Sequence, residues 1–123
     1  MPDAALTATL RGRRILLVED DYMMAQDLAN ELQGAGVDVL GPVPDIRGAL
    51  ALLDAGPAPD GAILDINLGG EMVYPLADTL QERDIRFVFA TGYEGWSIPE
   101  RYRNLPRLEK PLGLRQIAEV LVA

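Results

Sequence analysis

A few chemically active side chains stand where short runs of this sequence end. Glu19 and Asp20 follow one apolar run, and Asp65 ends another. Thr91 closes a third apolar run, and Lys110 ends a mixed one. Clustered carboxylates repel one another, and a bound cation relieves that repulsion. Because Mg²⁺ prefers a few carboxylates, waters and a phosphate oxygen, these residue types indicate magnesium-dependent phosphoryl chemistry.

The acids are the candidate ligands of the metal. Asp20 and Asp65 could bind Mg²⁺ directly through side-chain oxygens, and Glu19, with its longer arm, could bind directly or through water. Asn67 could offer its backbone carbonyl. The chain contains no cysteine and no histidine, so a bound metal would be a hard ion with oxygen ligands.

The other groups suit a transferred phosphoryl group. Asp65 would be the nucleophile, as an aspartyl phosphate requires. Lys110 would meet the phosphoryl group as a point charge, and Thr91 could donate a hydrogen bond to it. The loose transition state of phosphoryl transfer needs positioning and charge neutralisation more than acid–base groups. A site without histidine can therefore perform this chemistry.

Each of these residues also has an ordinary structural explanation. Glu19 and Asp20 could form a solvated helix start, which the helix dipole favours. Asp65 could cap a turn. Thr91 could be a turn residue, and Lys110 a surface lysine. We favour the functional interpretation, because all these explanations would have to hold at matching strand ends.

The hydrophobic pattern predicts the strands that position these residues. Continuous apolar runs at 14–18, 61–65 and 87–90 are typical of strands that are covered on both faces. Mixed runs at 37–42 and 107–110 indicate edge strands. The sequence therefore predicts three central strands and two edges.

Apolar residues recur at helical spacing between these strands. Asp21 and Asp45 are placed to cap the first two helices. A capping box at 97–100 begins a further helix that must end before Pro106, and we expect it to be short and mobile. The other four apolar stripes are Met24, Ala25, Leu28, Ala29 and Leu32; Ile46, Ala49, Leu50 and Leu53; Val73, Leu76, Ala77 and Leu80; and Leu114, Ile117, Ala118 and Leu121.

Strands that alternate with helices five times predict an α/β fold. The burial pattern fits a flavodoxin-like, doubly wound parallel sheet with five strands in the order 2-1-3-4-5 and five helices. In this order the first and third strands are neighbours. Glu19, Asp20 and Asp65 should therefore converge at the topological switch point, where ligands bind.

Composition narrows the class of protein. A chain of 123 residues suits one domain, and its net charge of −8 argues against nucleic-acid binding. No apolar stretch reaches membrane-spanning length and the start lacks a signal-peptide pattern, so we expect a cytoplasmic protein that does not bind membranes. Residues 1–12 lack clean periodicity, and we expect a flexible tail there ahead of a domain at 13–123.

The sequence resembles the receiver domain of bacterial two-component response regulators. Residues 15–21, the Asp65 strand, 90–91 and 110–111 carry the resemblance, which covers about 14–123. It implies a CheY-like fold and a single-domain regulator of a phosphorelay. It also implies that a sensor histidine kinase phosphorylates Asp65. Such a protein is no enzyme beyond self-catalysed phosphotransfer and autodephosphorylation.

The resemblance also implies roles for the remaining residues. Glu19 and Asp20 match the acids that hold Mg²⁺, and Thr91 and Lys110 match the residues that sense and pair with the phosphoryl group. Receivers commonly have a cis peptide at the bond matching Lys110–Pro111. The protein would signal through contacts with a downstream protein or act as a phosphate sink.

Three features set the sequence apart from typical receivers. Arg107 stands where they have Tyr or Phe, three residues before the lysine. Residues 89–93 read Phe-Ala-Thr-Gly-Tyr, similar to the signature of the "FAT GUY" single-domain receivers, which also lack that aromatic. The loop at 68–71 also lacks the usual proline. Members of this subfamily are often partners of HWE or HisKA2-type kinases.

The absent aromatic changes how a signal would leave the site. Arg107 should stay at the surface or pair with Glu94 or Glu100, since burying an unpaired guanidinium is costly. The segment 93–105 has few apolar anchors, so we expect phosphorylation to order or shift it through Thr91.

Three other classes of protein are open alternatives. A Mg²⁺-dependent phosphohydrolase of the haloacid-dehalogenase type also forms an aspartyl phosphate, but it wants a second Asp where Asn67 stands. A flavodoxin would cradle a phosphate in its first loop, where Glu19 and Asp20 would repel it. A non-phosphorylated receiver-like binding module would not need the intact acids, Thr91 and Lys110.

Overall fold

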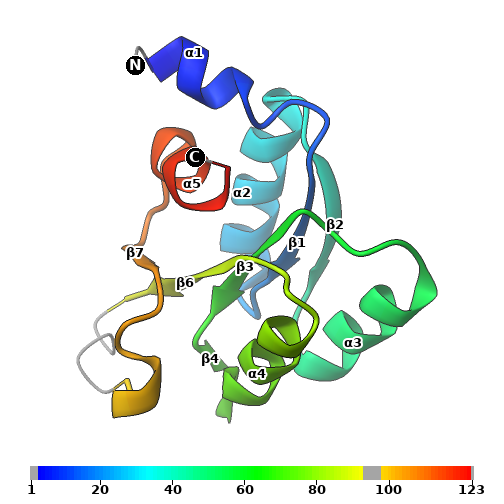
Figure 1. Cartoon of the computed structure of the whole chain (residues 1–123), viewed down its shortest axis with the longest axis vertical. Helices are drawn as coiled ribbons and strands as arrows, with labels where there is room; N and C mark the ends of the chain where they lie inside the picture. Colours follow the sequence, from blue (N-terminus) through cyan, green and yellow to red (C-terminus); the bar gives the residue numbers. More distant parts are fainter. Residues whose placement is uncertain (1–2, 93–97, 123) are drawn as a thin grey trace.

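The protein folds around one parallel sheet. The structure is a computed structural model, and it describes residues 3–92 and 98–122. The five-stranded sheet has the order β2-β1-β3-β6-β7, which is the predicted order 2-1-3-4-5 (Figure 1). The strands are β1 (Arg14–Val18), β2 (Asp38–Val43), β3 (Gly61–Asp65), β6 (Phe87–Thr91) and β7 (Arg107–Glu109).

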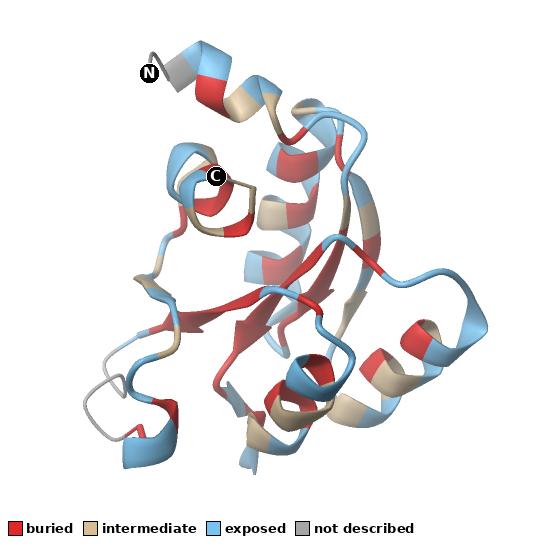
Figure 2. Ribbon diagram, viewed as in Figure 1, coloured by how far each residue is buried: buried red, intermediate tan, exposed pale blue. Residues whose placement is uncertain are grey.

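The apolar runs form the centre of the sheet, as predicted. Every residue of β3 and of β6 is buried, whereas the edge strands β2 and β7 are partly exposed (Figure 2). The register pairs Leu16 with Ala62, and Ala62 with Phe87. β1 and β3 therefore end side by side, at the carboxyl edge where the predicted site lies.

Helices cover both faces of the sheet. The elements are α2 (Tyr22–Gly34), α3 (Ile46–Ala55), α4 (Tyr74–Glu82) and α5 (Leu114–Leu121). Leu17 and Ile63 share a buried cluster with α2 and α5, while Leu16 and Leu64 share one with α3 and α4. Because side chains alternate along a strand, each central strand feeds both cores. None of the described helices is long and apolar enough to cross a membrane.

Both predicted N-caps are confirmed. The Oδ1 atom of Asp21 accepts a hydrogen bond from the Met24 N–H at 3.1 Å, and that of Asp45 accepts one from Gly48 at 2.7 Å. Such caps satisfy amides that have no partner within the helix. The Asp21 cap fixes where α2 begins, directly after the acids of the predicted site.

The N-terminal segment differs from the predicted tail. Residues Asp3–Ala8 form helix α1, which packs against α5 (Figure 1). Leu6 and Leu10 are buried and join the core on the α2–α5 side. Two leucines four residues apart are too few to give a helical signature in sequence, but they suffice to anchor a short helix once α5 offers a surface. The division at residue 13 stays a prediction.

The connection from β6 to β7 also differs from a regular helix. The predicted capping residue Ser97 lies outside the described residues, and after it the chain forms only a 3₁₀ turn, η2 (Glu100–Tyr102). Tyr102 is buried, and its ring stacks on Tyr74 of α4 at 4.5 Å between centroids. Its hydroxyl donates a hydrogen bond to Asp78 at 2.9 Å. Tyr102 therefore anchors η2, together with the buried Ile98 just before it.

Candidate functional site at the carboxyl edge of the sheet

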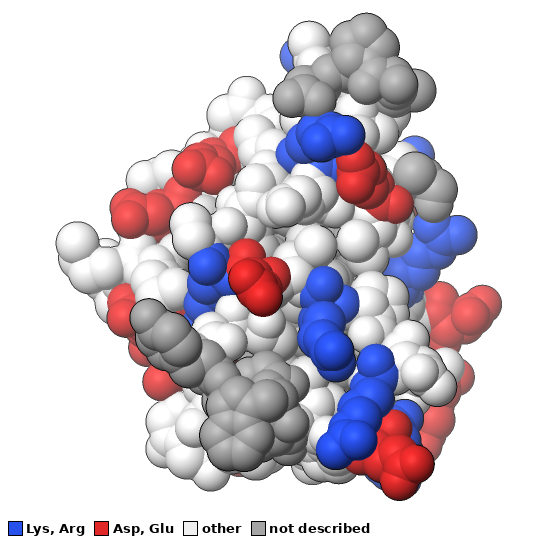
Figure 3. All heavy atoms as spheres, turned by 90° about the vertical axis from the view of Figure 1, so that its left-hand side faces the viewer, with Lys and Arg blue, Asp and Glu red and all other residues white. Residues whose placement is uncertain are grey.

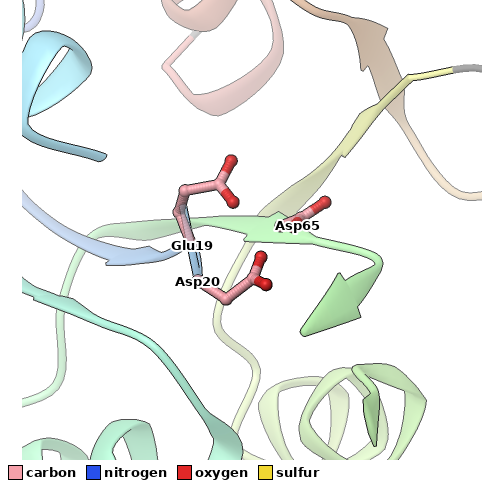
Figure 4. Close-up of side chains that lie close together, drawn as sticks. All are labelled: Glu19, Asp20 and Asp65. Atoms are coloured by element: carbon pink, nitrogen blue, oxygen red, sulfur yellow. The ribbon is translucent and has the colours of Figure 1, made fainter. Parts of the chain in front are cut away.

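The three predicted acids converge. Glu19 and Asp20 directly follow β1, and Asp65 is the last residue of the neighbouring strand β3. One carboxylate oxygen from each lies within 4.8 Å of the other two (Figure 4). Glu19 and Asp65 are buried and Asp20 is exposed, so the cluster opens to solvent on the Asp20 side.

Lys110 joins the same cluster. Its Nζ atom lies 2.9 Å from Oε1 of Glu19 and 3.0 Å from Oδ1 of Asp65. The lysine directly follows β7, two strands away from β3, so its long side chain reaches back across the strand ends. The Lys110–Pro111 bond is cis, as the resemblance predicts.

One ammonium does not neutralise three carboxylates. Burial is the main reason why the pKa of Asp65 rises from 3.8 to about 7, and Glu19 adds to the rise while Lys110 opposes it. Burial lowers the pKa of Lys110, but its hydrogen bonds to Glu19 and Asp65 outweigh that effect and raise the pKa overall. The site therefore holds surplus negative charge in a partly dry environment, which a further cation would stabilise.

The donor set fits a hard divalent ion. Glu19, Asp20 and Asp65 offer only oxygen atoms, and the exposed position of Asp20 leaves an open side for water. The loop after Asn67 also approaches this side, because a Cβ atom built on Gly69 would lie 3.6 Å from Asp20. An acidic triad of this kind is typical of the Mg²⁺ site of receivers.

Asn67 lies in a small hairpin beside the acids. The sequence predicted a loop here, but Asn67–Leu68 (β4) and Glu71–Met72 (β5) form two antiparallel strands. The side-chain Oδ1 of Asn67 accepts a hydrogen bond from the Gly70 N–H at 2.7 Å. The side chain is thus committed to its own turn, which leaves the backbone carbonyl as the group that this residue could offer a metal.

Thr91 lies at the end of β6, as predicted, and it is buried. Its hydroxyl donates a hydrogen bond to the Leu108 carbonyl of β7 at 3.4 Å, and its own carbonyl accepts one from the Lys110 N–H at 2.8 Å. In this arrangement the threonine side chain is held by the edge strand. Arg107 is exposed, in agreement with the expectation that it stays outside the core, and Glu94 lies outside the described residues.

Sequence reasoning missed an apolar hollow beside the acids. It has a volume of about 140 Å³ and lies between α2 and the segment after β7. Met24, Leu28 and Leu112 contribute its apolar wall, while Glu19 and Asp65 line it on the side of the site. Met24 and Leu28 belong to the apolar helical stripe predicted from the sequence. In the structure Leu28 is only half-buried and Met24 is exposed, and no pattern in the sequence indicated this.

A doubly wound sheet that carries an acidic triad and a lysine at its carboxyl edge defines the class of receiver domains. Two solution structures of SdrG resemble the chain at sequence level, one from Sphingomonas melonis Fr1 at 41% identity and a TM-score of 0.76, covering 92% of this chain and 94% of that one. The other is the BeF3-activated conformation of SdrG from Pseudomonas melonis Fr1. It has 42% identity and a TM-score of 0.73, and the match covers 88% of this chain and 92% of that one.

A third structure is more distant. The non-phosphorylated HemR receiver domain from Leptospira biflexa has 27% identity and a TM-score of 0.73, with 90% of this chain and 95% of that one covered. No family model and no curated protein matches the chain.

The chain belongs to the response regulator receiver domains, and it is close to SdrG. Its fold is therefore CheY-like. Membership places it in two-component signalling, among signalling proteins that are not conventional enzymes and whose partners are histidine kinases.

Proposed function

We propose that this chain is a single-domain response regulator that accepts a phosphoryl group on Asp65 from a histidine kinase. The observation that carries the proposal is the convergence of Glu19, Asp20, Asp65 and Lys110 at adjoining strand ends. These groups supply a nucleophile, ligands for a cation and a fixed positive charge. The SdrG conformation activated by BeF3 supports the same interpretation by similarity.

The transfer would proceed by attack of an Asp65 carboxylate oxygen on the phosphorus of a phosphohistidine. The new P–O bond forms as the P–N bond breaks, and the bonding electrons leave with the imidazole of the kinase, which takes a proton from solvent. Lys110 already contacts Oδ1 of Asp65, so its ammonium is placed to pair with the transferred group.

The acids would hold a cation beside the attacking carboxylate, and that cation would favour its ionised form. Mg²⁺ supplies charge neutralisation at the phosphoryl oxygens when bound. Glu19, Asp20 and Asp65 would hold it by their side chains, and Asn67 by its backbone carbonyl. Because opposite charge favours the ionised form, the raised pKa of Asp65 would fall beside a bound cation, and Asp65 would be available as the nucleophile near neutral pH.

The signal would leave the site through Thr91. A phosphoryl group on Asp65 competes with the Leu108 carbonyl for the threonine hydroxyl, which loosens the contact between β6 and β7. We expect this change to shift and order the connection that includes η2, and a downstream protein to read it. Slower amide exchange at residues 98–105 after addition of beryllium fluoride would support this route, and unchanged exchange would contradict it.

The finer assignment rests on resemblance. The Phe-Ala-Thr-Gly-Tyr sequence at 89–93 and the arginine at position 107 support a place among the "FAT GUY" receivers. That subfamily suggests a kinase of the HWE or HisKA2 type. The cytoplasmic location expected from the sequence is also part of the proposal. Alternatively, the protein would act as a phosphate sink, which accepts phosphoryl groups from the kinase without signalling to a downstream protein.

The test is intact-mass measurement after incubation with Mg²⁺ and acetyl phosphate. The wild-type protein should gain the mass of one phosphoryl group, and Asp65→Asn should gain none. Asp54→Asn is a matched control, because Asp54 is an exposed aspartate that pairs with Arg83 on the far side of the sheet from α2. Labelling of Asp65→Asn equal to that of the control would contradict the proposal.

A further inference from the structure

The apolar hollow beside the acids has no use in the phosphoryl chemistry. It has a volume of about 140 Å³ and lies between α2 and the segment after β7. Met24, Leu28 and Leu112 contribute its apolar wall. In proteins an apolar cavity of about 150 Å³ is large enough to bind benzene. The hollow can therefore accept one apolar group of about that size.

Two acids that the phosphoryl site does not use also line the hollow. Asp27 and Glu31 belong to α2, and both are exposed, so they mark the solvent side of the hollow. They stand four residues apart on the helix, where side chains are neighbours and like charges repel each other. Neither forms an ion pair with a Lys or Arg within residues 3–92 and 98–122. A cation bound between them would relieve this repulsion.

The basic side chains near the hollow are engaged elsewhere. Lys110 lines the hollow too, but its ammonium is held by Glu19 and Asp65 at 2.9 and 3.0 Å. Figure 3 shows Lys and Arg side chains on the side of the molecule that carries β7 and α5, yet none of the described ones pairs with an acid of α2. Arg115, the basic residue of α5, pairs with Glu119 at 3.3 Å. Four carboxylates and one ammonium therefore line the hollow.

We propose that this hollow, together with Asp27 and Glu31, is a binding site for a small organic cation, in which a primary ammonium is joined by a short link to an apolar group the size of a benzene ring. The apolar group fills the hollow against Leu28 and Leu112, and the ammonium, which has three N–H donors, bridges the two carboxylates. Such a site goes beyond the proposed function, because binding needs neither a metal nor a phosphoryl group. It would give the regulator a small-molecule input beside Asp65.

Charge and shape favour this ligand over the alternatives. The surplus of carboxylates around the hollow repels an organic anion. A neutral apolar molecule would fill the hollow but leave the repulsion between Asp27 and Glu31 in place. An inorganic cation would pair with those acids but would remove no apolar surface from water. Only a ligand with both parts uses the apolar wall and the two acids together.

The test is a titration of the ¹⁵N-labelled full-length chain with benzylammonium chloride in metal-free buffer. The amide signals of Leu28, Glu31 and Leu112 should shift and saturate at roughly millimolar ligand, as expected for so small a compound. Benzyl alcohol keeps the ring and lacks the charge, whereas methylammonium keeps the charge and lacks the ring. Each should bind at least about fivefold more weakly than benzylammonium, because each makes only half of the contacts.

A charge-neutral variant tests the two acids directly. Asp27→Asn combined with Glu31→Gln should weaken binding of benzylammonium by about fivefold, because it removes both partners of the ammonium. Glu82→Gln combined with Asp84→Asn is the matched control, since it removes two exposed acids on the α4 side of the sheet, and it should bind as the wild type does. Asparagine suits the left-handed backbone at position 84, where φ is 58°.

Four results would overturn the proposal. These are equal affinity for benzyl alcohol and benzylammonium, equal affinity for methylammonium and benzylammonium, equal binding by the two double variants, or no shifts at tens of millimolar ligand. Shifts confined to the amides of Asp20 and Asp65 would also overturn it, because they would place the ammonium at the metal site. Since the titration contains no Mg²⁺ and no phosphodonor, its outcome is independent of whether Asp65 is phosphorylated.

Discussion

The two halves of the carboxyl edge are held in different ways. Where β1 and β3 end, Glu19 and Asp65 are buried, and Lys110 contacts both at about 3 Å. Where β6 and β7 end, the side chain of Thr91 is held by one long hydrogen bond to a strand of three residues, although its backbone carbonyl also accepts the Lys110 N–H. The first half fixes the chemistry in place, whereas the second is bound weakly enough to respond to it. A signalling domain needs both properties, because a site that moves loses its geometry and a readout that cannot move carries no signal.

The largest effect is expected from removing the aromatic anchor of the weak half. Tyr102→Ala removes a ring that stacks on Tyr74 and approaches Phe89, and should lower the free energy of unfolding by roughly 3 kcal/mol. Tyr102→Phe keeps the ring and loses the hydrogen bonds that the hydroxyl forms with Asp78 and Arg101, so it should cost about 1 kcal/mol. Urea unfolding of the two variants measures both values. Equal losses would show that the ring is not the anchor.

The next effect concerns the strong half. Lys110→Ala leaves two buried carboxylates without their cation and should lower the free energy of unfolding by roughly 2 kcal/mol in metal-free buffer. Mg²⁺ should restore part of this loss, because it replaces the missing positive charge. Urea unfolding with and without Mg²⁺ provides the measurement, and Arg47→Ala serves as the surface control. If Mg²⁺ does not change the loss in free energy of unfolding, the positive charge of Lys110 and the metal ion do not act on the same carboxylates.

The pH dependence of stability tests the charge balance at Asp65. Its pKa is 3.8 in the unfolded chain and about 7 in the folded state, so the folded state binds the proton more tightly. This carboxyl therefore contributes a loss of stability as pH rises between those two values. Asp65→Asn removes the contribution. In metal-free buffer the variant should melt at a higher temperature than the wild type above about pH 7, and the gap should close toward pH 3.8. A difference in melting temperature that grows as the pH falls would contradict the raised pKa of Asp65.

The smallest effect is expected from the exposed acid. Mg²⁺ at ten times its dissociation constant stabilises a protein by about 1.4 kcal/mol, so the melting temperature of the wild type should rise with millimolar Mg²⁺. Asp20→Asn removes one ligand oxygen and should reduce that rise. Asp60→Asn is an exposed control outside the triad, and it should keep the full rise. Equal rises in all three proteins would place the ion elsewhere.

The hydrophobic pattern predicted most of the strong half. Continuous apolar runs identify β1, β3 and β6, and their order follows from crossover handedness, so the meeting of Glu19, Asp20 and Asp65 follows as well. Asp21 and Asp45 were predictable as caps because the interaction spans only three residues. Local signals therefore suffice where the function depends on strand ends.

The weak half and two further parts of the molecule were less predictable, because their contacts are distant in sequence. Tyr102 is buried only because Tyr74 and Phe89 happen to lie beside it, and no periodicity marks it. Leu6 and Leu10 gave no helical pattern, yet the surface of α5 makes them core residues. The apolar hollow beside Met24 depends in the same way on how far α2 lies from the segment after β7.

Lys110 is, in effect, a counter-ion tethered to the site that it neutralises. The chain fixes its local concentration next to Glu19 and Asp65, whereas a metal ion must come from solution. A dissolved cation therefore competes with an intramolecular one, which always has the advantage of proximity. We expect this competition to keep metal binding weak and metal exchange fast. The occupancy of the metal site would then follow the free concentration of the ion, and Asp65 would alternate between metal-bound and metal-free states.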